Sequence, residues 1–224
     1  MKGGLFEVKS KRRIECEKNR MEGLKVKQKK FIYIVIVILS ISLFLSACGG
    51  GNPTGINDNL VYKTYTNNDF SYKYPADWEN SYTDPVLDSF EDMIMDIPGL
   101  SYSSGAVVIG NDQRMFLITA LDCSGFYNIT EESLEEFIGG FMEGIKYSNP
   151  NVSFSEISNL TIDNNPAKKV VYIQPFENYS IKADVIATYE GTTFYLIVYG
   201  CKESNYNSTL GLFSEMRDSI VLYD

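Results

Sequence analysis

The chain has 224 residues, of which 44% are hydrophobic, so it has enough apolar material to fold without metals or disulfides. Residues 1–47 carry 11 Lys or Arg against 4 Glu, a net charge of +7, whereas residues 48–224 carry 9 against 25 acidic residues, a net charge of −16. The acidic part argues against nucleic acid as a partner, and the lack of any histidine excludes Ser-His-Asp and Cys-His catalysis and imidazole zinc sites.

The first predicted element is a targeting segment, residues 1–47. Lysines from Lys25 onward precede an apolar run, Phe31 to Ala47, whose 17 residues are at the short limit for spanning a bilayer. The run ends in Leu45-Ser46-Ala47-Cys48, which resembles the bacterial lipobox. The resemblance implies cleavage between Ala47 and Cys48 and a diacylglycerol lipid on the Cys48 thiol. The alternatives are an uncleaved signal anchor and, for the start of the segment, Met21.

The next twelve residues, 48–59, are predicted to be the lipidated cysteine and a flexible tether, because they include Gly49-Gly50-Gly51 and Asn52-Pro53. Residues 60–224 then form the globular domain. Two cysteines lie in it, Cys123 and Cys201, each just after a predicted strand end. In a compartment that permits disulfides, a bond between them and two buried free thiols are both open.

The domain is predicted to begin with two short strands, Leu60–Thr66 and Asp69–Tyr74, which are rich in Tyr, Val and Thr. A helix is expected from Asp84 to Ile97, because Asp84 suits the N-cap, Pro85 suits the first turn, and Pro98 follows its end. One face of this helix carries an acidic row formed by Asp84, Asp88, Asp92 and Asp96. Carboxylates suit calcium, so the row is a weak calcium candidate, but a straight helix spreads such groups and a solvated face explains it better.

Two further strands, Gly105–Ile109 and Met115–Leu121, are predicted next, with the serines just before Gly105 in a loop. The clearest helix begins after Thr130, which is a suitable N-cap, and Ile129 is expected to pack on the first turns as a hydrophobic staple. Its apolar stripe consists of Leu134, Phe137, Ile138, Phe141 and Ile145.

Two hairpins are predicted to follow. The first pairs Val152–Ile162 with Ala167–Gln174. The second pairs Tyr179–Tyr189 with Thr192–Gly200 across a two-residue turn at Glu190-Gly191. The returning strand is apolar on both faces, so helices are expected on both faces of the sheet. A last helix is expected from about Tyr206 to Ile220.

Three segments together resemble the PsbP-like family. Phe70 to Trp78 is an aromatic strand that runs into Tyr-Pro-x-x-Trp, Ile162 to Ala167 matches the mid-chain turn that ends in Pro-Ala, and Leu212 to Ile220 fits the final helix. Asn164 stands where a Gly is usual, and Asn tolerates the left-handed conformation of such a turn. The resemblance implies an α+β fold, an antiparallel β-sheet with helices on both faces in an α-β-α sandwich.

These observations favour a non-enzymatic accessory lipoprotein that binds another protein of the cell envelope. Its expected location is the extracytoplasmic face of a Gram-positive cell membrane, with no cofactor besides the lipid on Cys48. A ligand-binding lipoprotein for a glycan, peptide or cation is the alternative, since 15 of the 16 tyrosines lie after residue 47, although sandwich strands are also rich in Tyr. A histidine-free hydrolase is a third hypothesis, but no carboxylate pair stands out.

Overall fold

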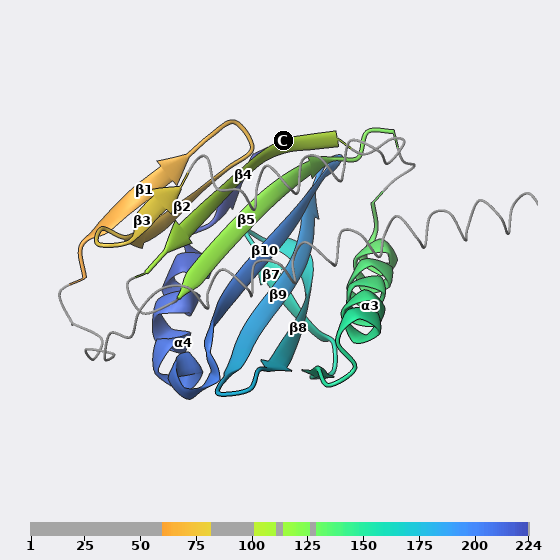
Figure 1. The fold of residues 1–224 in the computed structure, drawn as a ribbon. Coiled ribbons are helices and arrows are strands. Elements are labelled where there is room, and N and C mark those ends of the chain that lie inside the picture. Colours follow the sequence, from red (N-terminus) through yellow and green to blue (C-terminus); the bar gives the residue numbers. More distant parts are fainter. Residues whose placement is uncertain (1–59, 82–100, 111–113, 126–128, 224) are drawn as a thin grey trace, which may run out of the picture.

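The computed structural model describes residues 60–81, 101–110, 114–125 and 129–223. The helices, shown in Figure 1, are α3 (Glu131–Ser148) and α4 (Glu203–Asp218). The strands are β1 (Tyr62–Thr66), β2 (Phe70–Pro75), β3 (Glu79–Ser81), β4 (Ser101–Ile109), β5 (Met115–Asp122), β6 (Ser153–Phe154), β7 (Ser158–Ile162), β8 (Asn165–Pro175), β9 (Ser180–Glu190), β10 (Thr193–Lys202) and β11 (Val221–Leu222).

The predicted targeting segment, the tether and the helix from Asp84 to Ile97 lie outside the described residues. Within the described part of the chain, no helix combines the length and hydrophobicity needed to cross a membrane.

A mostly antiparallel β-sheet dominates the fold (Figure 1). Eight strands form it in the order β3-β4-β5-β10-β9-β8-β6, with β7 also paired to β8. A second, three-stranded sheet has the order β1-β2-β11 and carries the last described strand next to one of the first. Consecutive strands are mostly neighbours, as hairpin connections require, whereas β5 and β10 meet although more than seventy residues separate them.

The helix α3 begins where the sequence predicts. Thr130 is its N-cap, and the Thr130 Oγ1 accepts a hydrogen bond from the Ser133 backbone N–H at 3.3 Å while the Ser133 hydroxyl accepts one from the Thr130 N–H. Ile129 packs against the hydrophobic cluster that contains Leu134, as expected of a staple. The Lys168 ammonium of β8 donates to the Asn159 side chain at 2.7 Å and lies 3.6 Å from Glu135 of α3, which links the helix to the sheet.

The buried apolar side chains form two clusters. The α3 cluster contains the apolar stripe of α3 and alternate residues of the sheet, such as Phe194, Leu196 and Val198 of β10. The α4 cluster contains residues of α4, of β2 and of the remaining strand positions, such as Tyr195 and Ile197 of β10. Successive side chains of a strand point to opposite faces, so β10 contributes to both clusters and is apolar from Phe194 to Cys201. This explains why its sequence lacks an apolar–polar alternation.

Two positive-φ turns set the register of the hairpins. Asp163 and Asn164 have φ values of 48° and 67° between β7 and β8, so Asn164 takes the left-handed conformation that the sequence predicts. In the β9–β10 hairpin, the predicted turn at Glu190-Gly191 is wrong by one position. Gly191, with φ of 54°, is the first central residue, which suits a type II′ turn, and Glu190 pairs with Thr193. The true pairing is displaced by two residues, which leaves every side chain on its predicted face.

Some predicted loops and boundaries differ from the structure. The serines before Gly105 are part of β4, which starts at Ser101 and contains a β-bulge between Tyr102 and Ser104. The short strands β3, β6 and β11 have two or three residues each, too few to leave a periodic pattern in the sequence. Helix α4 begins at Glu203, three residues earlier than predicted, and ends at Asp218.

Candidate functional site

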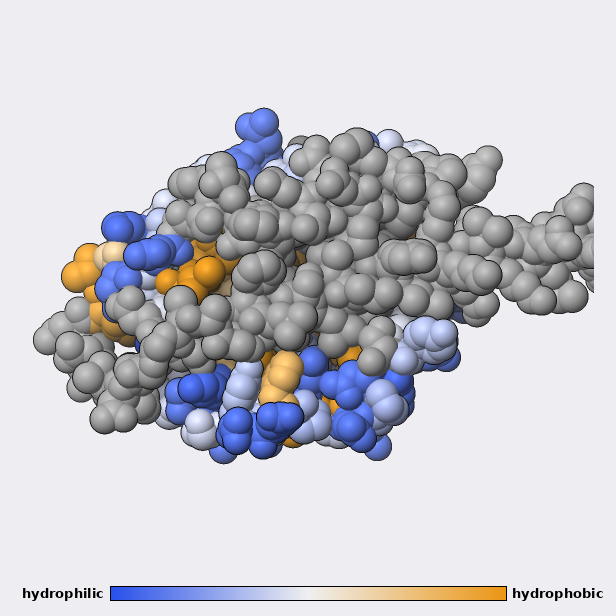
Figure 2. All heavy atoms as spheres, viewed as in Figure 1, coloured by the Kyte–Doolittle hydropathy of each residue, from blue (hydrophilic) through white to orange (hydrophobic). Residues whose placement is uncertain are grey.

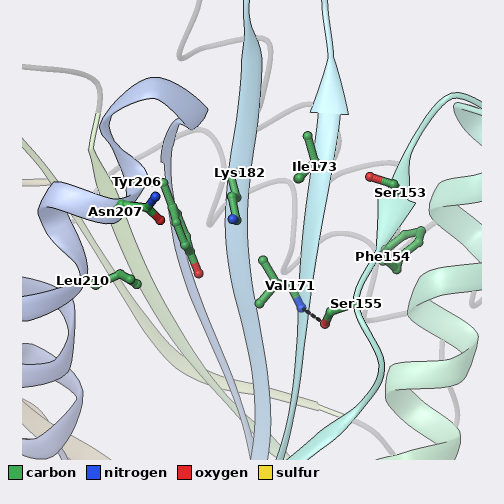
Figure 3. Close-up of a pocket in the computed structure, with 9 residues that line it drawn as sticks. All are labelled: Ser153, Phe154, Ser155, Val171, Ile173, Lys182, Tyr206, Asn207 and Leu210. Atoms are coloured by element: carbon green, nitrogen blue, oxygen red, sulfur yellow. Dashed lines mark hydrogen bonds between the residues drawn. The ribbon is translucent and has the colours of Figure 1, made fainter.

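A groove of about 490 Å³ lies between α4 and the β6 region, and we call it the α4 groove (Figure 3). Its lining residues come from four segments that are far apart in the sequence but adjacent in the fold. They are Ser153, Phe154, Ser155, Val171, Ile173, Lys182, Tyr206, Asn207 and Leu210.

The sheet forms the floor of the α4 groove, and two segments form its walls. Val171 and Ile173 of β8 are half-buried and point to the same face as Lys182 of the neighbouring strand β9, because Ile173 pairs with Lys182. The β6 wall is held in place by a hydrogen bond from the Val171 backbone N–H to the Ser155 hydroxyl, at 3.0 Å. Leu210 of α4, 38% exposed, faces it from the other wall. The lining therefore combines apolar and polar groups at an accessible surface.

A buried carboxylate lies beside the α4 groove. Asp184 of β9 is 1% exposed and accepts a hydrogen bond from the hydroxyl of Tyr206. Its other oxygen lies 3.5 Å from the ammonium of Lys169. Burial, followed by the hydrogen bond to Asp184 and the negative charge there, raises the pKa of the Tyr206 phenol well above its ordinary value. Tyr206 therefore keeps its hydroxyl proton and donates it in a hydrogen bond, and both carboxylate oxygens of Asp184 have a partner.

Lys182 carries a positive charge at the floor of the α4 groove. Its Nζ lies 4.4 Å from the centroid of the Tyr206 ring, a cation–π distance. Two neighbouring lysines make similar contacts: Lys146 lies over Phe154 at 5.5 Å and Lys202 over Tyr179 at 5.8 Å. Lysine side chains therefore cover the rings that line this end of the molecule.

The chemistry available in the α4 groove is limited. Lys182 and Tyr206 are its ionisable lining residues, and no carboxylate or thiol is among the lining residues. Over the described ranges, no group of three or more Cys, Asp or Glu residues lies close enough to hold a metal ion. The arrangement suits recognition through apolar contact and one charge.

A second polar cluster joins the two sheets. The Asp69 carboxylate accepts hydrogen bonds from the hydroxyls of Ser103 and Ser104 at the β4 bulge, and the Asn67 amide donates to the Ser104 hydroxyl at 2.9 Å. The Tyr195 hydroxyl lies 3.0 Å from the Asp69 backbone carbonyl. Each of these groups is satisfied by a neighbour within the fold, so the cluster connects the β1–β2 turn to the large sheet and is not a candidate active site.

The two domain cysteines are buried thiols that form no disulfide in the structure, and the sheet topology explains why they are not bonded to each other. Cys123 follows β5 and donates its backbone N–H to Thr192, just before β10 starts, whereas Cys201 lies at the far end of β10. Thr192 and Cys201 are nine residue steps apart along the strand, which is about 30 Å, whereas a disulfide needs Cα atoms within about 7 Å. Cys123 follows the end of β5 and Cys201 lies next to the last residue of β10, and because β5 and β10 are antiparallel neighbours these two strand ends lie at opposite edges of the sheet.

Of the other predicted site residues, Ala47, Cys48 and the acidic row Asp84, Asp88, Asp92 and Asp96 lie outside the described residues. Many tyrosines belong to the core: Tyr72, Tyr195 and Tyr199 are among the largest fully buried side chains. Lys182, Asp184 and Tyr206 are not among the site residues predicted from the sequence. The sequence did contain a signal for two of them: Lys182 and Asp184 are two residues apart in a predicted strand, so their side chains must lie on the same face of the sheet.

A family model described as "PsbP-like protein" matches residues 52–221 of the chain. No curated protein sequence matches it. The solution structure of CyanoP, the cyanobacterial PsbP of Synechocystis sp. PCC 6803, is 12% identical, with 78% of this chain and 98% of that chain covered and a TM-score of 0.47. The structure of LpqN, involved in cell envelope biogenesis of Mycobacterium tuberculosis, is 9% identical, with 77% and 90% covered and a TM-score of 0.47.

Proposed function

The chain belongs to the PsbP-like protein family, and from this premise we propose that its domain is a non-enzymatic binding module, an accessory to another protein of the cell envelope. The single observation that carries the proposal is the α4 groove, which is lined on three sides and combines an apolar floor with one lysine. Its volume of about 490 Å³ suits a ligand or a segment of a partner chain.

The protonation of Cys123 and Tyr206 supports a role without catalysis. Burial, assisted by the charge of Asp122, raises the pKa of the Cys123 thiol to about 11, so the thiolate needed for nucleophilic attack is scarce at neutral pH. The Tyr206 phenol is likewise held in its protonated form. A hydrolase that uses paired carboxylates is less favoured, because the groove lining contains none.

The proposed location follows from the sequence before the domain. The basic segment, the apolar run and Leu45-Ser46-Ala47-Cys48 support cleavage after Ala47 and a diacylglycerol anchor on Cys48. Residues 48–59 would then connect the lipid to the domain at residues 60–224 on the extracytoplasmic face of the membrane. In Figure 2 the coloured side chains along the lower edge of the molecule are mostly hydrophilic, as expected of a surface that faces water.

We also propose that the domain is layered as an α-β-α sandwich. The division of the core supports this, because alternate side chains of β10 join the cluster of α3 and the cluster of α4. In such an arrangement α4 leaves part of β8 uncovered, and the α4 groove lies over that part of the sheet.

A ligand-binding lipoprotein is the second candidate, favoured by the volume of the α4 groove. A glycan is the least suitable ligand, because sugars stack on free aromatic faces and Lys182 and Lys146 lie over the rings of Tyr206 and Phe154. No cation site is suggested by the lining, whose one charged residue is a lysine.

The test is in-cell crosslinking followed by mass spectrometry on the full chain and on Cys48→Ala, with membrane fractionation of both. We expect the native chain in the membrane fraction, a shift of Cys48→Ala out of it, and one envelope protein crosslinked only to the native chain. Equal fractionation of the two chains would contradict the anchor. Correct anchoring without any specific protein partner would contradict the accessory role and favour the ligand-binding candidate.

A further inference from the structure

We propose that the α4 groove binds an extended peptide segment of the partner protein, which places one carboxylate on Lys182 and apolar side chains on the floor beside it. This inference rests on the proposed function and adds the chemistry by which the partner is recognised. Four observations support it. They are the charge of the groove lining, the hydrogen bonding of the neighbouring Asp184, the orientation of the Lys182 ammonium and the net charge of the whole domain.

Lys182 is the one charged residue among the nine that line the α4 groove. Its Nζ contacts the ring of Tyr206, and it pairs with no carboxylate of the described residues. A lysine at a half-buried position beside apolar side chains has lost part of its hydration without gaining an anion. A ligand carboxylate would supply that missing partner through a charge-assisted hydrogen bond.

The nearest buried carboxylate does not satisfy Lys182. Asp184 is two residues along the same strand and faces the same side of the sheet. However, it is 1% exposed, accepts the Tyr206 hydroxyl, and has Lys169 at 3.5 Å as its cationic partner. Tyr206 thus has two roles at once, since its hydroxyl binds Asp184 while its ring lies under Lys182.

The contact with Tyr206 also fixes where the ammonium points. Holding the Nζ 4.4 Å from the ring centroid restricts a side chain that otherwise has many rotamers. A restricted ammonium loses less entropy when it binds a carboxylate, which favours binding. Val171 and Ile173 lie next to it on the floor, so a residue beside the carboxylate in an extended peptide would meet an apolar surface.

The net charge of the whole domain favours a partner with a single carboxylate over a polyanionic partner. Residues 48–224 carry a net charge of −16, so a polyanionic surface such as a phospholipid membrane is repelled at long range. One carboxylate on an otherwise neutral or basic segment avoids that repulsion and is still attracted locally by Lys182. The hydroxyl of Ser153 and the amide of Asn207 at the rim can bind peptide backbone groups.

The test uses the anchored full chain in cells, with a photo-crosslinking amino acid placed at Asn207 in the wall of the groove. The same amino acid at Tyr147, which is 79% exposed on α3, is the matched position outside the groove. The crosslinked peptide is identified by mass spectrometry and compared in Lys182→Glu, Lys182→Ala and Lys182→Arg backgrounds. Lys73→Glu on β2, an exposed lysine, makes the same charge change elsewhere.

We expect the segment captured at Asn207 to contain an Asp or Glu flanked by apolar residues. Capture should fall at least about tenfold in Lys182→Glu and Lys182→Ala and stay within about twofold in Lys182→Arg and Lys73→Glu. Replacing the captured acidic residue by Lys should restore crosslinking to Lys182→Glu. Unchanged fluorescence of Trp78 in Lys182→Ala shows that lost capture is not lost folding.

Four outcomes would overturn the inference. Capture that is equal in all Lys182 variants would remove the role of the lysine, and a captured lipid, glycan or segment without a carboxylate would remove the proposed chemistry. Anchor-dependent capture at Tyr147 but none at Asn207 would leave the accessory function standing and refute the groove as its site. If neither position captures a protein, the proposed function fails as well.

Discussion

The hydroxyl of Tyr206 at the start of α4 donates a hydrogen bond to the buried carboxylate of Asp184 on β9, so a helix and a strand are joined by a charged hydrogen bond beside the groove. The two residues are 22 positions apart in the sequence, and β10 lies between them along the chain. The same tyrosine forms part of the groove lining, which makes the stability of this end of the fold and the shape of the candidate site interdependent.

Tyr206→Phe removes the hydroxyl and retains the ring that contacts Lys182. We expect the free energy of unfolding to fall by about 1.5–3 kcal/mol, because the buried carboxylate of Asp184 loses a hydrogen-bond donor. Urea denaturation measures the change. Tyr147→Phe removes an exposed hydroxyl on α3 and is expected to change stability by less than about 0.5 kcal/mol. Equal effects of the two variants would show that the Asp184 contact does not stabilise the fold.

Gly110→Ala tests the packing of Trp78, the last residue of the Tyr-Pro-x-x-Trp segment, because a Cβ at Gly110 would lie 2.8 Å from Trp78 Cε2. The indole is 3% exposed and cannot move aside freely, so we expect a loss of about 1–3 kcal/mol. Trp78 is the single tryptophan of the chain, so a shift in intrinsic fluorescence should accompany the loss.

The matched control for this substitution is Gly139→Ala. A Cβ there has no atom within 4 Å, and the position lies inside α3, where Ala is favoured over Gly by about 0.5–1 kcal/mol. We expect a higher melting temperature for Gly139→Ala and a lower one for Gly110→Ala. The same sign for both would mean that the Trp78 contact does not limit the size of residue 110.

From the conformation of Asn164 in the β7–β8 turn, we expect two substitutions at this position to differ in their effect on the free energy of unfolding. This residue has a φ of 67°, a conformation that costs a β-branched residue about 1–2 kcal/mol. Asn164→Val is therefore expected to lower the free energy of unfolding by that amount, whereas Asn164→Gly should leave it unchanged or slightly higher. Thermal unfolding of the three chains provides the measurement. A stable Val variant would show that the turn adopts another conformation.

The pH dependence of stability should appear on the alkaline side. Burial raises the pKa of Tyr172 to about 12 and that of Cys123 to about 11, above their ordinary values of 10.0 and 9.0. The unfolded chain therefore loses these protons at a lower pH than the folded chain, so stability is complete below pH 9 and falls as pH rises toward 12. Each group contributes at most about 1.4 kcal/mol per pH unit.

Urea denaturation from pH 7 to 12 measures this decline. Tyr172→Phe should be less stable at neutral pH or equal to the native chain, but its stability should fall less steeply above pH 10. A slope identical to that of the native chain would exclude Tyr172 as a contributor.

The state of Cys123 and Cys201 is directly measurable. We expect non-reducing peptide mapping of the oxidised, folded protein to give both cysteines as separate free-thiol peptides, because the strand β10 separates them. A reducing agent should then leave the melting temperature unchanged. A single linked peptide containing both residues would contradict the arrangement of β5 and β10.

The sequence by itself determined the features that depend on neighbours along the chain. The N-cap at Thr130, the stripe of α3, the two main hairpins and the left-handed Asn164 all rest on local periodicity and turn chemistry, and the structure confirms them. One correction applies to the first hairpin, because its predicted strand Val152–Ile162 is two short strands, β6 and β7, which both pair with β8. The two-residue error in the β9–β10 register arose because a shift by two keeps every side chain on its face, so hydrophobic patterning cannot detect it.

Only the tertiary structure decided the relations between distant segments. The pairing of β5 with β10 separates the two cysteines, the strand β11 adds to β2, and α4 brings Tyr206 to Asp184 and Lys182. Each of these depends on which surfaces are buried together when the whole chain folds, and burial free energy is not directional, so no local pattern encodes the partner. For the same reason, no local pattern predicts the α4 groove, which is assembled from four separate segments. The one hint in the sequence is the pair Lys182 and Asp184, two residues apart on β9.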